Sequence, residues 1–277
     1  MSFRPINDDH AVQSATFAIA LNRPLAWSSI EALIKSSLDW RKELPAIDLP
    51  QTMEVQINPQ TGTPVNRITR GVEFSHKRPD GSASWQLDVL GSEIRVTTTL
   101  YTRWAPTCAK AGDILLGVAG QLAMLESARG LGVLAISLHV ADVFATTDEK
   151  PDYSELFARN DRIPLALFSF GRLWHTHSGW FMPRPAGFGS VLNQLNIDAR
   201  TGTDDTSLTA IPDTQIRIII QHNQIYRPTE PINFGSSGEN ALVDAVLREM
   251  PQMHQNNKAV LRDLLTPSMQ QRIKVNV

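Results

Sequence analysis

The order of its strand-like and helix-like segments constrains the fold of this chain more than any single motif. In the first half, alternation of apolar and polar residues predicts strands at 15–22, 51–57, 70–78, 83–90 and 93–104. A helix is predicted over 24–40, where Ser28 followed by Glu31 matches a capping box. Another helix begins near Pro106, because proline is tolerated in the first turn. The first half therefore reads β-α-β-β-β-β-α.

The second half gives almost the same order. Strands are predicted at 131–145, 172–182, 189–199, 206–211 and 214–226. A short helix is predicted at 151–159, and the apolar run 164–170 fits either type of element because its period is too short to decide. The tail, 239–274, has a helical apolar stripe that Pro251 and Pro267 are expected to interrupt or kink.

This repeated order predicts an α+β fold made by structural duplication. A polar leader (1–14) would precede an N-terminal α+β unit (15–129) and a C-terminal α+β unit (130–277) that ends in a long helix. Each unit would bury one face of an antiparallel sheet under its helix. The TATA-binding protein has this element order twice, which is an analogy of order alone. The two sheets could join into one saddle or pack side by side, and both arrangements stay open.

Composition narrows the classes of function. The chain has 277 residues, 42% of them hydrophobic, which suits one large globular domain or two modest ones. Its formal net charge of −2 provides no global field that would attract nucleic acid or an anionic membrane. We find no apolar segment of signal-peptide type near the N-terminus and no apolar run near the ~18–20 residues of a membrane span. A cytoplasmic location is expected.

Cys108 is the single cysteine, which excludes an intramolecular disulfide and a zinc site with two thiolates. It lies near a predicted helix start, where the helix dipole could lower its pKa. Because spacing identifies no partner histidine, a structural role is favoured over a nucleophilic one.

Motifs for common cofactors and catalytic mechanisms are missing. The phosphate-loop pattern, the G-x-S-x-G elbow and the H-E-x-x-H zinc helix do not occur. AGFGSV (186–191) has two glycines but no third glycine and no helix after it, so we interpret it as a loop that enters a strand. Asp204 and Asp205 follow Gly202 in a plain hairpin turn. No cofactor is predicted, and no catalytic residue is assigned.

The stretch LWHTHSGWF (173–181) contains the sharpest candidates for a metal site. Residues two apart on a strand point to the same face, so His175 and His177 could reach one metal ion. A third ligand would have to come from elsewhere, with His139, His222 or Asp198 as formal options. The competing interpretation is a strand whose histidines face solvent and whose tryptophans face inward. We favour it because a working metal site needs three or four ligands.

The same region offers a stacking surface for nucleic-acid bases. The residues concerned are Arg172, Trp174, Trp180, Arg184 and Phe188. Arginine and aromatic side chains suit that task. The competing interpretation is that these aromatic residues fill the core, which the near-neutral charge favours. In RIIIQHNQIYRP (217–228), a strand with apolar residues on both faces, His222 is interpreted as a hydrogen-bonded sheet residue.

Three segments give the whole chain a resemblance to a known family. They are TTLYTRWAPTCAKAGDILLGV, the strand pair VLNQLNIDA and QIRIIIQHNQIY, and the ending VLREMPQMHQNNKAVLRDLLTPSMQQRI. The chain resembles an uncharacterised family that is sporadically distributed among bacteria and archaea. Met253-His254 stands where that family has Leu-His before an acidic residue, and Gln255 departs from this pattern. The family implies no catalytic residue, and its patchy distribution implies mobile elements or defence-related complexes.

Three hypotheses follow. The first is a non-enzymatic, cytoplasmic binding or assembly protein with a protein partner or self-association and no membrane contact. The second is a nucleic-acid-binding module that uses the 172–188 segment, and the third is a metal-dependent hydrolase centred on His175 and His177. The absence of catalytic spacing favours the first.

Overall fold

A computed structural model describes residues 2–7, 9–36, 38–57, 64–126, 130–169, 171–184, 189–201, 215–233 and 238–275. The first half contains β1 (Arg4–Pro5), β2 (Val12–Leu21), α1 (Trp27–Ile34), α2 (Asp39–Glu43), β3 (Ala46–Asp48), β4 (Gln51–Ile57), β5 (Pro64–Lys77), β6 (Ala83–Leu90), β7 (Glu93–Thr98) and α3 (Trp104–Leu125). The second half contains β8 (Gly132–Thr146), the 3₁₀ turns η2 (Tyr153–Glu155) and η3 (Leu165–Ser169), β9 (Trp174–Met182), β10 (Ser190–Thr201), β11 (Ile216–Arg227), β12 (Ile232–Asn233), α4 (Gly238–Leu264) and α5 (Pro267–Arg272).

The fold is α+β, built on one large antiparallel sheet. Its main order is β3-β5-β6-β7-β2-β8-β11-β10-β9, so the first long strand of each half lies at the centre. β2 pairs with β8 over most of its length, which joins the halves into one continuous sheet. Of the two arrangements left open by the sequence, side-by-side packing of separate sheets is therefore excluded. The short strands β1 and β12 add to β8, and β4 pairs with β5.

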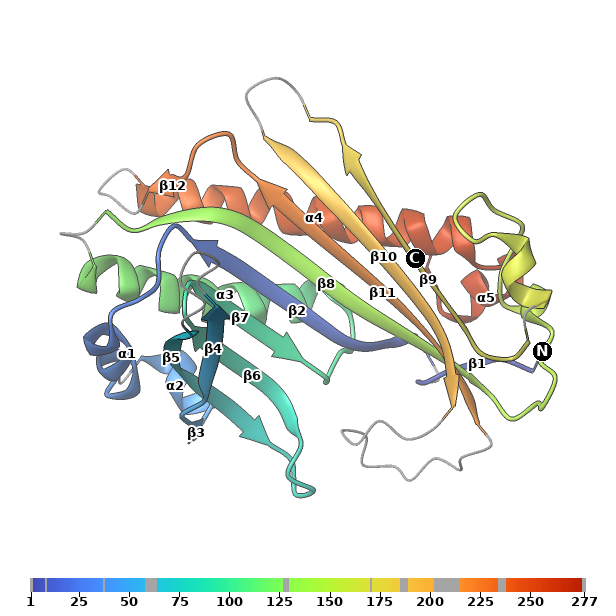
Figure 1. The fold of residues 1–277 in the computed structure, drawn as a ribbon, viewed down its shortest axis with the longest axis horizontal. Coiled ribbons are helices and arrows are strands. Elements are labelled where there is room, and N and C mark those ends of the chain that lie inside the picture. The colour runs from blue at the N-terminus through green and yellow to red at the C-terminus, as the bar shows by residue number, and fades with distance from the viewer. Residues whose placement is uncertain are drawn as a thin grey trace.

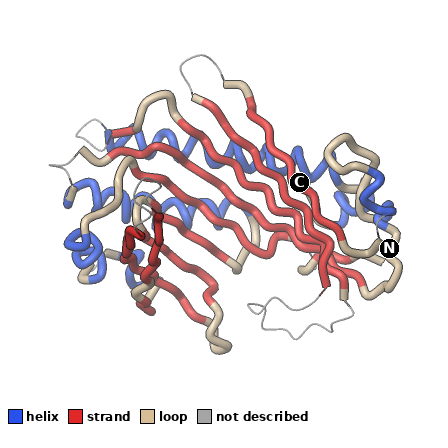
Figure 2. The backbone as a smooth tube through the Cα atoms, in the orientation of Figure 1, coloured by secondary structure: helices blue, strands red, loops and turns tan. Residues whose placement is uncertain are grey.

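Helices cover one face of this sheet and leave the other face open. Figure 1 shows α3 and α4 crossing behind the strands, and Figure 2 shows no helix in front of them. Leu115 and Val118 of α3, and Met253 of α4, have no exposed surface, and they pack against the inward residues of the strands. Each such side chain contributes about 1.5–3 kcal/mol by burial. The uncovered face is therefore where the sheet can meet another molecule.

The strand sequences explain why one face of the sheet packs on the helices and the other stays open. In β10, Val191, Leu195 and Ile197 are buried on the helix side, while Gln194 and Asn196 alternate with them and are partly exposed. A strand with an apolar face and a polar face packs the apolar one on the helices. The alternation in the sequence thus determines that the open face is polar.

Several predicted elements end at different residues. The strand predicted at 93–104 stops at Thr98, and residues 99–103 connect it to α3, which begins at Trp104. The helix predicted at 151–159 is only the 3₁₀ turn η2, and the ambiguous run 164–170 contains η3. The predicted strand 206–211, the turn at Asp204-Asp205 and the unit boundary at Arg129 lie outside the described residues.

The two prolines of the tail have different effects. Pro251 lies inside α4 without ending it, and Pro267 starts α5. Proline removes one helical hydrogen bond, here the bond to the carbonyl of Leu247. Leu247 is an exposed residue, so water can satisfy that carbonyl. Of the interruption or kink predicted at the two prolines, an interruption occurs at Pro267, between α4 and α5, and does not occur at Pro251.

The predicted capping box is also absent. α1 begins at Trp27 with Ala26 as its N-cap, and Glu31 accepts a hydrogen bond from the Trp27 indole at 2.9 Å. Glu126, which directly follows α3, supplies the missing acceptor: its carboxylate accepts from the Ala26 N–H at 3.3 Å and from the Ser29 hydroxyl at 2.5 Å. A residue far along the chain therefore caps this helix.

Among the described residues, one helix meets the length and composition of a membrane span. α3 has 22 residues, with a mean hydropathy of 1.3 in its most apolar window. The sequence analysis found no such run. In the structure, α3 packs its apolar stripe on the sheet as a core helix does.

Candidate functional site

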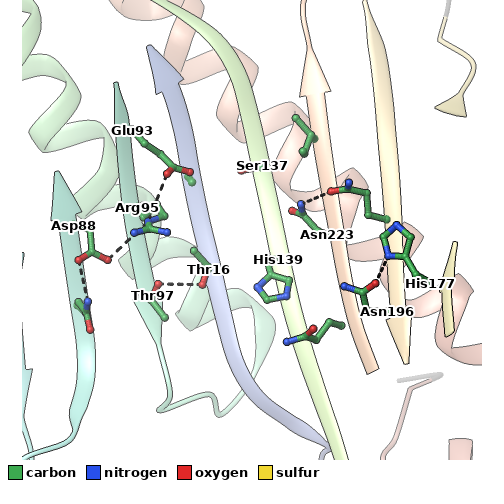
Figure 3. A pocket seen from close by; sticks show the side chains of 15 residues that line it. Thr16, Asp88, Glu93, Arg95, Thr97, Ser137, His139, His177, Asn196 and Asn223 are labelled. Atoms are coloured by element: carbon green, nitrogen blue, oxygen red, sulfur yellow. Dashed lines mark hydrogen bonds and ion pairs between the residues drawn. The ribbon is translucent and has the colours of Figure 1, made fainter. Parts of the chain in front are cut away.

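The open face of the sheet contains a hollow of about 600 Å³ that extends over the middle strands. Strands β2, β6, β7, β8, β9, β10 and β11 all contribute side chains to it (Figure 3). The polar groups are Thr16, Gln86, Asp88, Glu93, Arg95, Thr97, Ser137, His139, His177, Gln194, Asn196, Gln221 and Asn223. Most are amides, hydroxyls and imidazoles, so the floor of this hollow presents both donors and acceptors.

Neighbouring strands hold these groups in place by hydrogen bonds. The Thr16 and Thr97 hydroxyls lie 3.0 Å apart, and the Asn223 amide donates to Gln194 Oε1 at 2.9 Å. Each pair comes from adjacent strands, as cross-strand neighbours do. The hollow is therefore a preorganised polar surface.

The charged groups that line this hollow are one arginine and two carboxylates. Arg95 lies between Asp88 and Glu93, with nitrogen–oxygen distances of 3.9 Å and 3.8 Å (Figure 3). Asp198 contacts His175 at 2.6 Å. Burial, with the nearby Asp88 and Asp48 carboxylates, raises the pKa of Glu73, while Lys77 acts to lower it. A phosphate polymer needs an excess of cations, which this face does not provide.

The two histidines of LWHTHSGWF lie on the open face, and the two tryptophans lie on the helix side. His175 and His177 are exposed, whereas Trp174 is 8% exposed and Trp180 is partly buried. This is the strand orientation that the sequence analysis favoured. Phe181 shares the face of the histidines and is 70% exposed.

The structure gives the histidines polar partners. His175 Nδ1 bonds to Asp198, and His177 Nδ1 bonds to Asn196 on the neighbouring strand. Of the other ligand options, His139 lines the same hollow, and His222 lies on the opposite face of the sheet. Within the described residues, no group of three or more histidine, cysteine, aspartate or glutamate side chains could hold a metal ion.

The predicted stacking residues do not form one surface. Trp174 packs in the core beside Tyr153 and Phe157, and Trp180 stacks on His222 with ring centroids 5.7 Å apart. Their aromatic faces are therefore occupied by the protein itself.

The two arginines of the predicted stacking surface do not lie with these tryptophans. The Arg184 guanidinium pairs with Glu249 at 2.5 Å. Arg172 is exposed at the start of β9, and Phe188 lies outside the described residues.

The second glycine of AGFGSV, Gly189, has a structural explanation. Gly189 has a φ of +78°, and a Cβ there would lie 2.0 Å from the Arg227 carbonyl oxygen. Glycine lets the start of β10 approach the end of β11.

Cys108 is half-buried, and burial raises its thiol pKa, which fits the structural role.

Sequence analysis missed a second group of polar residues on the helix side. Asp142, His222 and Asn257 are all buried: His222 Nδ1–H donates to Asn257 Oδ1 at 3.0 Å, and the Asn257 amide bonds to Asp142. Burial lowers the pKa of His222 to about 4, so it is neutral, as expected for a hydrogen-bonded sheet residue. The only signal in the sequence was a polar residue inside an apolar strand, at Asp142.

The fold and this surface define the protein as an α+β protein with a half-covered antiparallel sheet. The chain matches no family model, no curated protein and no solved structure.

Proposed function

We propose that the protein is a non-enzymatic binding and assembly protein of the cytoplasm. It associates with a second copy of itself through β9 and presents the polar open face to a partner. The single observation that carries this proposal is the free edge of the sheet: β9 pairs with β10 on one side and with no described strand on the other.

This edge lacks the features by which proteins prevent edge pairing. Short length, charged residues, proline and bulges protect natural edge strands. β9 has nine residues, WHTHSGWFM, without a charged carboxylate, lysine, arginine or proline. Its register with β10 is regular from Trp174 to Met182. The opposite edge is different, because β3 has three residues and ends in Asp48, which pairs with Lys77 at 2.8 Å.

The sequence of β9 is complementary to itself in the antiparallel direction. With Ser178 on a two-fold axis, His175 would face Phe181 of the second copy, and His177 would face Gly179. Cross-strand pairs with an aromatic ring stabilise a sheet by about 0.2–1 kcal/mol each. On the helix side, Trp174 would face Met182, a sulfur–aromatic pair. The resulting sheet would continue the polar face across both copies.

The order of strands supports the finer proposal of a duplicated fold like that of the TATA-binding protein. From the centre outward, the halves read β2-β7-β6-β5 and β8-β11-β10-β9. In each half the first long strand is central, the last long strand (β7 or β11) pairs with it, and a long helix (α3 or α4) follows. We propose that the two units arose by duplication and that self-association repeats the same antiparallel geometry.

The two other hypotheses have weaker support. A nucleic-acid-binding module would need the aromatic–arginine platform, whose tryptophans pack within the protein. A metal-dependent hydrolase would need a third ligand beside His175 and His177, and the described residues offer no such group. At the hollow one arginine meets two carboxylates, and this excess of negative charge favours a protein partner over a phosphate polymer.

The test is the mass of the purified protein in solution, measured by light scattering after gel filtration. The unmodified protein is expected to have twice the 30.7 kDa mass of one chain. Phe181→Lys should convert it to a monomer, because two added charges would lie at the paired edge. The side chain is 70% exposed in one chain, so folding should be unaffected.

Two matched variants make the test specific. Met124→Lys changes a residue that is 73% exposed on α3, and Met53→Lys changes one that is 66% exposed on β4, near the opposite edge. Both should remain dimeric. A monomeric unmodified protein, or dissociation by Met53→Lys but not by Phe181→Lys, would rule out assembly through β9.

A further inference from the structure

A cavity of about 120 Å³ lies on the helix side, apart from the open face. It is bounded by the end of the N-terminal segment, the turn before α3, the second half of α4 and the residues after α5. Its volume holds about four water molecules at ~30 Å³ each. A ligand of five or six heavy atoms would fill it.

The floor of the cavity is a buried carboxyl group. Asp142 is 2% exposed, and Asn257, which bonds to it, is 4% exposed. Burial raises the pKa of Asp142 to about 7, while the hydrogen bond from Asn257 acts in the opposite direction. The Asn257 amide is held by His222, whose other ring nitrogen lies 3.1 Å from Asn193. A buried network therefore keeps the carboxyl group in position.

Opposite charge lies toward the mouth of the cavity. Arg103 is exposed and lines the cavity, as do Lys258 and Lys274. Tyr101 also lines the cavity and is influenced by both charges: burial and the Asp142 carboxylate raise its pKa to about 12, and Arg103 acts to lower it. Arg103 is also the N-cap of α3 and makes no side-chain cap, so the positive end of this helix adds to the cationic side.

A flat aromatic pair forms part of the wall. Trp104 and His254 stack with ring centroids 4.0 Å apart and planes 2° from parallel. Burial and the nearby Lys258 lower the pKa of His254 to about 4, so the imidazole is neutral. The cavity is thus acidic at the floor, cationic at the mouth and neutral between them.

We propose that this cavity binds a small zwitterionic α-amino acid, of the size of glycine or alanine, with its ammonium group on Asp142 and its carboxylate on Arg103. A ligand with two opposite charges matches both ends of the cavity. A simple amine would be repelled by the cations at the mouth, and a simple carboxylate would bring no positive charge to the Asp142 carboxylate. The ligand ammonium supplies the counter-charge that a buried carboxylate requires.

The affinity of this site depends on pH in a defined direction. The charged groups that face Asp142 or line the cavity are His10, Tyr101, Arg103, His254, Lys258 and Lys274, and Asp9 pairs with Lys274. Burial lowers the pKa of His10, and His254 and Tyr101 titrate far from neutrality. Asp142 is therefore the group that ionises near pH 7. Because the ligand ammonium pairs with the ionised form, affinity for the amino acid rises as pH rises through 7.

The experiment is isothermal titration calorimetry of the full chain with glycine and alanine, at about pH 5.5 and 7.5, on either side of the Asp142 pKa. Acetate and methylamine serve as probes that carry one charge each. We expect one amino acid per chain, with at least about tenfold weaker binding of either single-charge probe. Binding should be tighter at the higher pH.

Three variants test the residues. Asp142→Asn keeps the shape and removes the charge, and Arg103→Ala changes an exposed residue, so that loss of binding there does not reflect misfolding. Each should weaken glycine binding at least about tenfold. The control Arg159→Ala removes an exposed arginine that does not line the cavity, and it should bind as the unmodified protein does. The proposal is overturned if neither amino acid binds at millimolar concentration, if acetate binds equally well, or if both site variants retain full affinity.

Discussion

Two aromatic residues of β9 are expected to contribute very differently to the stability of the fold. Trp174 and Phe181 lie seven positions apart in β9, on opposite faces, with 8% and 70% of their surfaces exposed. Trp174→Ala should lower the free energy of unfolding by about 3–5 kcal/mol, because it leaves a cavity beside Tyr153 and Phe157. Phe181→Ala should change that energy by less than about 0.5 kcal/mol.

Urea unfolding at a protein concentration that keeps the chains monomeric measures both values. The comparison isolates burial, since both substitutions truncate an aromatic ring on the same strand. Equal losses for the two variants would show that the helix side of β9 is not a packed core.

Alternation along a strand was enough to predict these orientations, because side chains of neighbouring residues point to opposite faces. It could not find the Asp142–Asn257 pair, whose members are separated by more than a hundred positions. For the same reason the cap of α1 was assigned to Ser28 and Glu31, while the structure uses Glu126. Local patterns predict local orientation, and they contain no information on a partner that only the tertiary fold brings near.

At the scale of elements, strands with regular alternation were predicted within a few residues. β6 was predicted at 83–90 and has those bounds, and β11 begins and ends within two residues of its prediction. Errors occurred where a strand-like pattern continues into a connecting segment, as at 99–103 after β7, and where the apolar run was too short for its period to be read, as at η3. The edge position of β9, on which the proposed assembly depends, needed the strand order and was not predictable from alternation.

The entry into β10 gives a prediction at this scale. Gly189→Ala would place a Cβ 2.0 Å from the Arg227 carbonyl oxygen, so the start of β10 would have to move away from the end of β11. Gly81→Ala is a matched control, since Gly81 also has a positive φ, +86°, but meets nothing within 4 Å. Backbone strain alone costs about 1–3 kcal/mol, and Gly189→Ala should exceed the control because it adds the clash.

Thermal unfolding of the two variants measures this difference. Amide hydrogen exchange would add a local readout, because loss of pairing at Ser190 and Arg227 should speed exchange there before it affects the centre of the sheet. If Gly81→Ala proved as destabilising as Gly189→Ala, close approach of the two strands would not be the reason for this glycine.

For the whole molecule, one sheet serves two purposes. Its helix side contains the core, together with the buried network around Asp142, while its open side and free edge remain for interaction. A buried carboxyl group beneath the helices is costly for stability, because burial disfavours its charged form. This cost makes the free energy of unfolding depend on pH, in a direction that the pKa of Asp142 determines.

The pKa of Asp142 is about 7 in the folded protein against 3.8 in an unfolded chain. Between these values the folded state keeps a proton that the unfolded state has lost. The contribution of this group to stability is therefore complete below pH 3.8, and it is lost as pH rises through 7. At about 1.36 kcal/mol per pKa unit, the loss is on the order of 4 kcal/mol.

Asp142→Asn should remove this dependence, because the amide keeps the shape and does not ionise. The free energy of unfolding of the variant minus that of the unmodified protein should increase from about pH 4 to pH 7 and then remain constant. The buried histidines His222 and His254 are neutral in the folded protein, so their protonation lowers the free energy of unfolding as pH falls toward 4. Both proteins share that effect, and it cancels in the difference. Urea unfolding at a series of pH values, without added ligand, measures the curve. A difference that stays constant across this range would mean that Asp142 titrates normally, and it would remove the buried acid on which the proposed amino-acid site depends.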